Sequence, residues 1–182
     1  MNGRHDICGQ AHSLTVLTSI CAGHESALAR YLNALGSGPA SPLSHVGRTH
    51  FARWVVVGDV VFEGTGERDH LQFAQLLFTS NFDGTDLDSY LESLRTGLGV
   101  AADEIWSHCN GYPGSGDPAA FAAYMRRHHV ESSLFFAAYG ARTVEDVTSS
   151  LALRNELIAF AMSTQGLPPA DLQSAFERRF PR

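Results

Sequence analysis

Two β-rich runs dominate the pattern of hydrophobic and polar positions along the chain. Residues 49–57 and 73–80 are rich in β-branched and aromatic side chains, and a polar connection containing glycines separates them. This pattern predicts a long antiparallel hairpin. His50 and Arg53 lie near the start of the first run, whereas Asn81 and Asp83 follow the second. We therefore expect these polar side chains to meet at one end of the sheet.

The rest of the chain alternates between predicted strands and helices. Strict alternation of polar and apolar residues predicts a strand over residues 13–20, and residues 131–139 supply a fourth strand. Apolar residues at helical spacing predict helices over 27–35, 85–98, 118–128, 143–161 and 167–180. Thr85 is the expected cap of the second helix, and Asp117 with Pro118 the expected start of the third. Residues 106–117 are dense in turn formers and predict a structured loop.

The order of these elements predicts a ferredoxin-like α+β fold. It reads βαββαβ, with an extra helix before the last strand and further helices after it, so helices would cover one face of a four-stranded antiparallel sheet. Residues 51–57 carry apolar side chains on both faces of their strand. A second apolar sheet face must be buried against something. A second copy of the chain is the economical cover, which predicts a homodimer that forms a dimeric α+β barrel.

Length, charge and cysteine use narrow the classes of protein. We expect residues 1–12 to be a mobile N-terminal tail and residues 13–182 to be one domain. The net charge of -6, without a cluster of Lys or Arg, disfavours binding to nucleic acid. No run reaches the roughly 18 apolar residues of a membrane span, and the first residues lack the apolar centre of a signal peptide. The three cysteines form no CxxC pair, so a reducing, cytoplasmic location is expected.

Several segments resemble known proteins. THFAR, SNFDG, HCNGYPG and LFFAAY resemble blocks of a bacterial and fungal group found near or within peroxidase-like proteins, and LTVLTSICAGHESALARYL resembles the first βα unit of dimeric α+β barrel proteins. That superfamily includes haem enzymes, such as dye-decolorizing peroxidases and chlorite dismutases, and cofactor-free monooxygenases. The resemblance implies a small-molecule oxidoreductase of peroxidase or monooxygenase type, with haem as the candidate cofactor.

Few individual residues of this chain match a motif of that superfamily. Asp83-Gly84 resembles the distal Asp-Gly of dye-decolorizing peroxidases, but this chain does not have the surrounding glycine at the spacing of that family. That family also has two fused repeats where this chain has one. No haem-ligating histidine is transferred by motif.

In the enzyme interpretation, the polar residues bind a small-molecule ligand. Arg53 would hold an anionic substrate group or a haem propionate, and His50 and Asp83 would act as acid, base or distal hydrogen-bonding groups. His50 and Arg53 are three positions apart, so they share a face only if a bulge breaks the alternation of the strand. Asn81, Trp54 and Tyr112 are the candidate substrate contacts.

Two histidines are candidate ligands of a haem iron. His108 lies in the loop over residues 106–117, which could act as a lid or ligand arm. His128 falls on the apolar stripe of the helix over residues 118–128. His108 is followed by Cys109, but adjacent His and Cys rarely ligate one metal, and the chain has no HxxxH or CxxC, so a structural zinc site is disfavoured.

The alternative interpretation assigns structural roles to the same residues. Arg53 would pair with Asp83 as a clamp at the hairpin end, His50 would bond a backbone carbonyl, and Asn81 would form a turn or a cap. The protein would then be a non-catalytic small-molecule or partner-binding module that dimerises.

Overall fold

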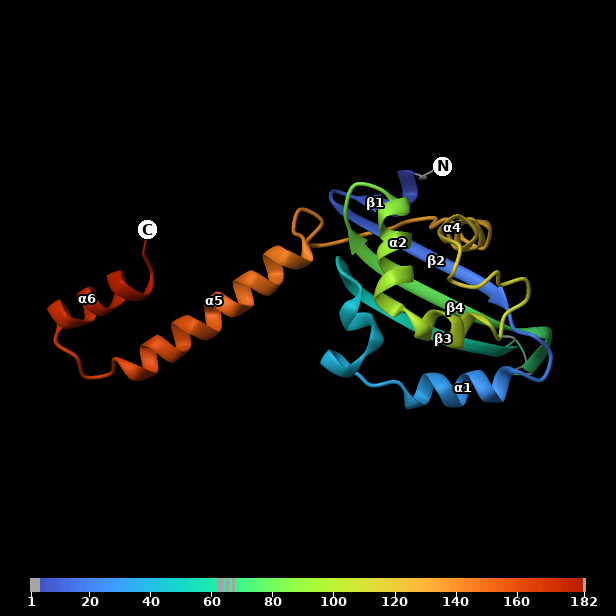
Figure 1. The fold of residues 1–182 in the computed structure, drawn as a ribbon, viewed down its shortest axis with the longest axis horizontal. Helices are drawn as coiled ribbons and strands as arrows, with labels where there is room; N and C mark the ends of the chain where they lie inside the picture. Colours follow the sequence, from blue (N-terminus) through green and yellow to red (C-terminus); the bar gives the residue numbers. More distant parts are fainter. Residues whose placement is uncertain (1–3, 62–63, 65, 67, 182) are drawn as a thin grey trace. The chain divides into compact units, whose positions relative to one another are not determined.

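The computed structural model describes residues 4–61, 64, 66 and 68–181. The chain divides into two compact units, Met1–Val144 and Glu145–Arg182, which Figure 1 shows from the blue N-terminus to the red C-terminus. The first unit holds the sheet and most helices, and the second holds two helices. The range 13–182, expected as one domain, therefore spans both units.

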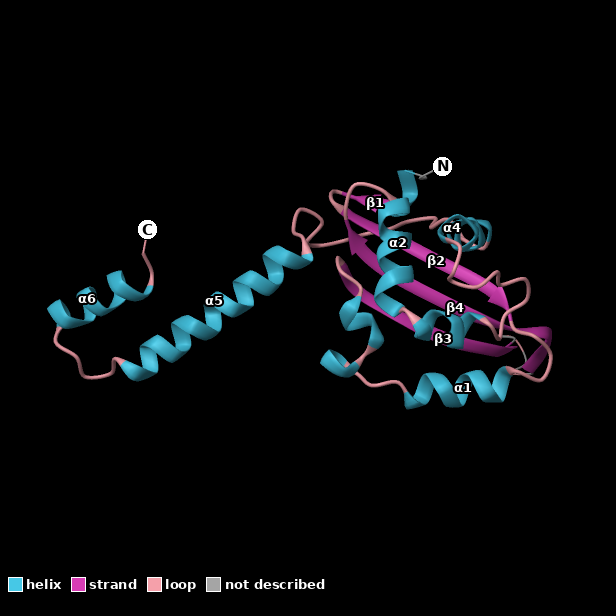
Figure 2. Ribbon diagram, viewed as in Figure 1, coloured by secondary structure: helices cyan, strands magenta, loops and turns pink. Residues whose placement is uncertain are grey.

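A four-stranded antiparallel sheet forms the centre of the first unit, as the α+β prediction requires (Figure 2). Its spatial order is β1-β2-β4-β3, with bounds Ile7–Cys8, Ala11–Ser19, Arg68–Asp83 and Thr49–Val61 in that order. The β3–β4 hairpin confirms the pairing predicted for residues 49–57 and 73–80. Both strands are longer than the apolar runs because backbone pairing continues into their polar ends.

The N-terminal residues belong to the sheet. A 3₁₀ turn, η1 (Arg4–Asp6), leads into β1, which pairs with the start of β2 through Ile7–His12 and Cys8–Ala11. Gly9 makes this turn at φ +68°, and a side chain there would collide with the carbonyl of Gly140. Residues 4–12, expected to be a tail, are thus fixed by pairing with β2 and by contact with Gly140.

The fourth strand expected over residues 131–139 does not form. The chain crosses the edge of β2 at one isolated bridge, Val16–His129, and Val130 N–H donates to the carbonyl of Thr15 at 2.8 Å. Continuing this antiparallel register would place residue 133 opposite His12, where Ile7 of β1 already pairs. The short N-terminal strand therefore occupies the edge that the predicted strand needed.

Helices cover one face of the sheet. They are α1 (Glu25–Ala34), α2 (Leu87–Leu98), α3 (Val100–Trp106) and α4 (Pro118–Arg127), with short 3₁₀ turns η2 (Gly38–Ala40) and η3 (Pro42–His45) before β3. Tyr90 of α2 stacks on Phe82 of β4, with ring centroids 3.8 Å apart, and Trp106 packs against Phe78. These contacts place the core between the sheet and α2–α4.

The predicted helix starts are right in one case and wrong in the other. Asp117 caps α4 by accepting hydrogen bonds from the backbone N–H groups of Ala119 and Ala120, and Pro118 follows it. The cap of α2 is Asp86 rather than Thr85, because the Asp86 carboxylate accepts from the backbone of Ser89. Thr85 instead donates to that carboxylate.

The other face of the sheet carries exposed apolar side chains. Phe51 is 77% exposed near the start of β3, an edge strand of the sheet, and Leu17, Val55 and Phe73 are also exposed. Successive side chains of a strand point to opposite faces, so Trp54 points to the helix-covered face while Phe51 and Val55 point to the other. We refer to Leu17, Phe51, Val55 and Phe73 as the open sheet face.

The second unit is a helical pair. It comprises α5 (Val144–Ser163), which begins at the boundary with the first unit, and α6 (Pro169–Arg179). Phe160, Phe176 and Phe180 pack together where the two helices face each other. The apolar residues of α5 that the sequence predicts to face inward are not buried. None of the helices in the described part of the chain combines the length and the apolar character needed to cross a membrane.

Candidate functional site

His50 and Asp83 meet where β3 begins and β4 ends. The register shifts between Thr49 and Phe51, and this bulge takes His50 out of strict alternation. His50 Nε2 lies 3.2 Å from Asp83 Oδ1, and both side chains are mostly buried. The ring N–H is not aligned for a hydrogen bond, so the contact is an ion pair only when the ring is protonated.

Asp83 also holds the backbone of a distant segment. Its Oδ1 accepts the N–H of Val144 at 2.8 Å, at the first residue of α5. Asp83 is 6% exposed. The carboxylate that the sequence suggested as a catalytic group therefore has two structural partners.

Arg53 is not part of the His50–Asp83 contact. The register pairs Arg53 with Thr79, and its Nε donates to the Thr79 hydroxyl at 3.1 Å. Thr79 precedes Asp83 by four residues, which is about 13 Å along a strand. The Arg53–Asp83 clamp of the structural interpretation is therefore wrong, and so is the bond from His50 to a backbone carbonyl.

The two candidate substrate contacts near the hairpin end lie on different faces. Asn81 pairs with Phe51 and is half-buried on the side of the open sheet face. Trp54 lies among the helices, with its ring 5.2 Å from Phe78 and 6.3 Å from Trp106. Trp54 therefore lies on the opposite face of the sheet from Arg53 and Asn81.

Tyr112 is fixed within the loop of residues 106–117. Its hydroxyl donates to Asp103 at 2.8 Å, and Ser115 donates to the same carboxylate through both its backbone N–H and its hydroxyl. Burial would raise the pKa of Asp103, but these hydrogen bonds outweigh it and hold the pKa below its ordinary value. Burial, with the neighbouring Asp103, raises the pKa of Tyr112. The loop is structured, as predicted, and Tyr112 acts as part of its frame.

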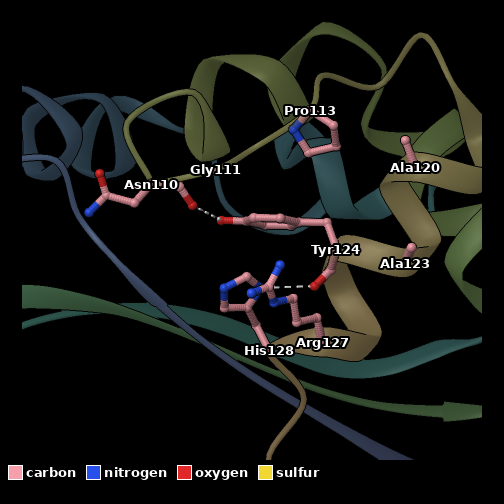
Figure 3. Close-up of a pocket in the computed structure, with 8 residues that line it drawn as sticks. All are labelled: Asn110, Gly111, Pro113, Ala120, Ala123, Tyr124, Arg127 and His128. Carbon is pink, nitrogen blue, oxygen red and sulfur yellow. Dashed lines mark hydrogen bonds between the residues drawn. The ribbon is translucent and has the colours of Figure 1, made fainter.

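A hollow of about 500 Å³ opens between this loop and α4 (Figure 3). The Tyr124 hydroxyl donates to the carbonyl of Asn110 at 3.3 Å, and His128 Nδ1 lies 2.9 Å from the carbonyl of Tyr124. Burial raises the pKa of Tyr124, and nearby Cys109 adds to this effect. The lining residues are Asn110, Gly111, Pro113, Ala120, Ala123, Tyr124, Arg127 and His128.

The two candidate haem ligands have different surroundings. His128 lies on the rim of this hollow. His108 is absent from its lining and instead faces His24, with the two Nδ1 atoms 3.2 Å apart. His24 was not among the residues that the sequence predicted for a site. Its Cys-x-x-His spacing from Cys21 could have indicated it.

The enzyme interpretation takes ligand contacts both from the hairpin end and from the loop of residues 106–117, but these two places lie far apart. The His50–Asp83 contact lies beside the start of β2, because Asp83 pairs with Ala11. The loop of residues 106–117 lies beside the end of β2, because Asn110 donates to the carbonyl of Ser19. Eight residues of strand separate these ends, about 26 Å. The hairpin end and the loop therefore cannot bind one small molecule together.

Sequence reasoning missed the most connected carboxylate of the N-terminal region. Asp6 accepts from the Ser13 hydroxyl at 2.8 Å, from the Ser132 backbone at 3.0 Å and from His129 Nε2 at 3.1 Å. It is 6% exposed. The available signal was Gly9-Gln10 between Ile7-Cys8 and Ala11, since a two-residue connection that contains glycine is typical of a short hairpin.

Comparison with protein-family models, with curated proteins and with solved structures finds no match for this chain. The resemblance to dimeric α+β barrel proteins and to the peroxidase-associated group therefore stays a prediction.

Proposed function

We propose that the protein is a non-catalytic binding module that works as a homodimer. The order of β2, α1, β3, β4 and α2 along the chain is that of the ferredoxin-like arrangement, up to the last strand. In this proposal the open sheet face of one copy packs on the same face of a second copy, as in a dimeric α+β barrel.

The exposure of Phe51 is the observation that carries the proposal. Phe51 lies near the start of β3 and is 77% exposed, and the register places Leu17, Val55 and Phe73 on the same face of the sheet. Burying a phenylalanine side chain contributes about 1.5–3 kcal/mol. Exposed apolar side chains that gather on one face of a sheet mark interaction sites on soluble proteins.

The charges on the sheet favour a second copy as the partner. Within β2, residues 51–57 of β3 and residues 73–81 of β4, Arg53 is the single residue with a formal charge. Its guanidinium is already bonded to Thr79 within the same sheet. The cores of protein interfaces are depleted of charge. A two-fold interface brings a patch onto itself, so a nearly uncharged patch suits self-association.

The partners of the polar residues favour binding over catalysis. Asp83 is engaged by His50 and the backbone of Val144, Arg53 by Thr79, and Tyr112 by Asp103. A general acid or base must instead reach a proton on the substrate. The hollow beside Tyr124 and His128 is the site where we expect the module to bind a small molecule, because ring faces, a cation and a backbone carbonyl converge there.

The homodimer is tested by placing a charge on the open sheet face of the full chain. Phe51→Lys removes the burial of a large side chain in both copies at once, a loss of about 3–6 kcal/mol. The dissociation constant, measured by sedimentation equilibrium, should therefore rise at least about 100-fold. Phe136→Lys is the matched control, because Phe136 is 78% exposed but lies outside the sheet.

Two results would contradict the homodimer. One is a wild-type chain that stays monomeric over the whole range of concentrations. The other is a Phe51→Lys dimer as tight as the wild type and the Phe136→Lys control. Far-ultraviolet circular dichroism of each variant separates a lost interface from a lost fold.

A second candidate function is a small-molecule oxidoreductase of peroxidase or monooxygenase type, and His128 favours it. The contact between His128 Nδ1 and the Tyr124 carbonyl leaves Nε2 for a ligand, an orientation that is common for metal-binding histidines. Arg127 on the same rim would pair with a haem propionate. Bound haem would supply the redox chemistry, while these two side chains would hold and orient it.

Haemin titration of the full chain tests this second candidate. A Soret band that is present in wild type, lost in His128→Ala and kept in His45→Ala would support it. His45 is a suitable control because it is exposed on η3, outside the hollow. If wild type retains no haem, or if His128→Ala keeps the band, the haem-dependent function fails while the dimeric module stands.

A further inference from the structure

Two histidine rings face each other beyond the end of β2. The Nδ1 atoms of His24 and His108 are 3.2 Å apart, and the ring planes make an angle of 75°. Zinc holds histidine nitrogens at about 2.0–2.1 Å in a tetrahedron, so two ligand nitrogens lie about 3.3 Å apart. The observed separation matches one edge of that tetrahedron. We propose that His24 and His108, with Cys21, form a site for Zn²⁺.

The backbone brings Cys21 to the two histidines. Its N–H donates to the carbonyl of His108 at 2.8 Å, next to the bridge between Ile20 and Cys109. Cys21 and His108 therefore lie opposite each other across an antiparallel pair, where Cβ atoms are about 4.5–5.5 Å apart. This pairing fixes the first two members of the site.

A tight turn supplies the third member. His24 N–H donates to the carbonyl of Cys21 at 3.0 Å, and Gly23 adopts φ +83° at the third position of this turn. Such a turn brings its first and fourth Cα atoms within about 7 Å. The Cys-x-x-His spacing thus places a thiol and an imidazole side by side.

One side-chain rotation completes the site. Cys21 Sγ now lies 3.2 Å from Asn110 Oδ1, and across the described residues no three His, Cys, Asp or Glu side chains converge on one point. Cys21 is half-exposed, so its thiol can move between staggered rotamers toward the two Nδ1 atoms. Water would fill the fourth position, as in zinc sites with three protein ligands.

The ligand chemistry selects the metal. Nitrogen and sulfur donors suit Zn²⁺, whereas Mg²⁺ and Ca²⁺ prefer oxygen. The competing explanation of the 3.2 Å separation is a hydrogen bond between the two imidazoles, which requires one protonated and one bare Nδ1. In the zinc site, the metal ion takes the place of that proton. The full chain should therefore bind a metal ion if the site exists, and none if the contact is only a hydrogen bond.

Titration with Co²⁺ under anaerobic conditions tests the site, because Co²⁺ reports the ligands of a zinc site through its absorption spectrum. We expect one equivalent to bind with tetrahedral d–d bands and a thiolate-to-cobalt charge-transfer band, and Zn²⁺ to displace it. His24→Ala and His108→Ala should each weaken binding by at least the roughly 10–100-fold that loss of a mere outer-shell partner costs. Cys21→Ser should remove the charge-transfer band.

Matched variants keep the test decisive. Cys8→Ser changes the other half-exposed cysteine, and His45→Ala changes an exposed histidine on η3, so both should leave binding and spectrum unchanged. Nitrogen-15 NMR of the wild type should show the metal on Nδ1 of His24 and His108. The proposal is overturned if Co²⁺ does not bind stoichiometrically, if His24→Ala binds as tightly as wild type, or if Cys21→Ser keeps the charge-transfer band. Thermal unfolding of each variant checks its fold.

Discussion

Replacing Asp6 with asparagine should destabilise the first unit far more than a change in a tail would. Asp6 accepts hydrogen bonds from Ser13, Ser132 and His129, and the carboxylate is nearly buried. Hydrogen bonds to a charged group contribute about 1.5–3 kcal/mol each. Asparagine keeps the shape and can still accept from one or two donors, but its amide N–H₂ cannot accept from His129. We therefore expect a loss of about 2–3 kcal/mol.

The assay is urea unfolding followed by circular dichroism at neutral pH, with a thermal melt beside it. A loss of this size corresponds to a fall in the melting temperature of about 4–12 °C for a chain of this length. Glu131→Gln is the matched control, because it also changes an acid to its amide, on an exposed residue next to Ser132. If Asp6→Asn stays within about 0.5 kcal/mol of wild type, as surface substitutions usually do, the N-terminal residues are a tail after all.

The effect of Asp6→Asn on stability should also depend on pH. Burial would raise the pKa of Asp6, but hydrogen bonds from Ser132, Ser13 and His129 outweigh it and lower the pKa below the ordinary value of 3.8. A carboxyl with a lower pKa in the folded state stabilises the protein above its unfolded pKa, and that stabilisation is lost as the pH falls through the folded pKa. The stability difference between wild type and Asp6→Asn should therefore shrink as the pH falls below 3.8. A difference that grows in acid would refute the reasoning.

Three further predictions concern other parts of the first unit. Tyr112→Phe should cost about 1–3 kcal/mol, because Asp103 loses a hydrogen-bond donor while Ser115 still holds it, and urea unfolding measures this loss. Gly9→Ala should cost more than 1 kcal/mol in the same assay, since φ is +68° and the new Cβ meets the backbone of Gly140. In a thiol titration at pH 8, Cys109 should react only on unfolding, because burial raises its pKa to about 11, whereas the two half-exposed cysteines react in the folded protein.

The hairpin and the long strand beside it could be predicted because their signals are local. Alternation of polar and apolar residues marks one buried face in residues 13–20, and the apolar runs of β3 and β4 are bounded by turn formers. The cap at Asp117 was equally readable, because a capping side chain and Pro118 stand together. Each of these features depends on residues within one element or on adjacent elements.

The fourth strand could not be predicted because two segments compete for one edge. Residues 131–139 have the composition of a strand, and nothing within them reveals that Ile7 and Cys8 occupy the edge of β2 where they would pair. The N-terminal segment wins there with a hairpin of only four paired residues, reinforced by the contacts of Asp6 with Ser132 and His129. Such competition between distant segments appears only in three dimensions.

The candidate site likewise has parts that could be predicted from the sequence and parts that could not. That His50 and Asp83 meet follows from pairing the start of one strand with the end of the next. The partner of Arg53 depends on register, and a shift of two residues decides between Thr79 and Asn81 on the same face. The contact between His24 and His108 joins segments 84 residues apart. No pattern within either segment reports it.

Isotope-filtered NOE spectroscopy tests the central claim, that a second copy covers the open sheet face. The sample is a dimer mixed from labelled and unlabelled full-length chains. We expect intermolecular signals from the Phe51 ring to the methyl groups of Leu17 and Val55 in the second copy. A dimer whose intermolecular signals all arise outside these residues, or a chain with no intermolecular signals at any concentration, would contradict it.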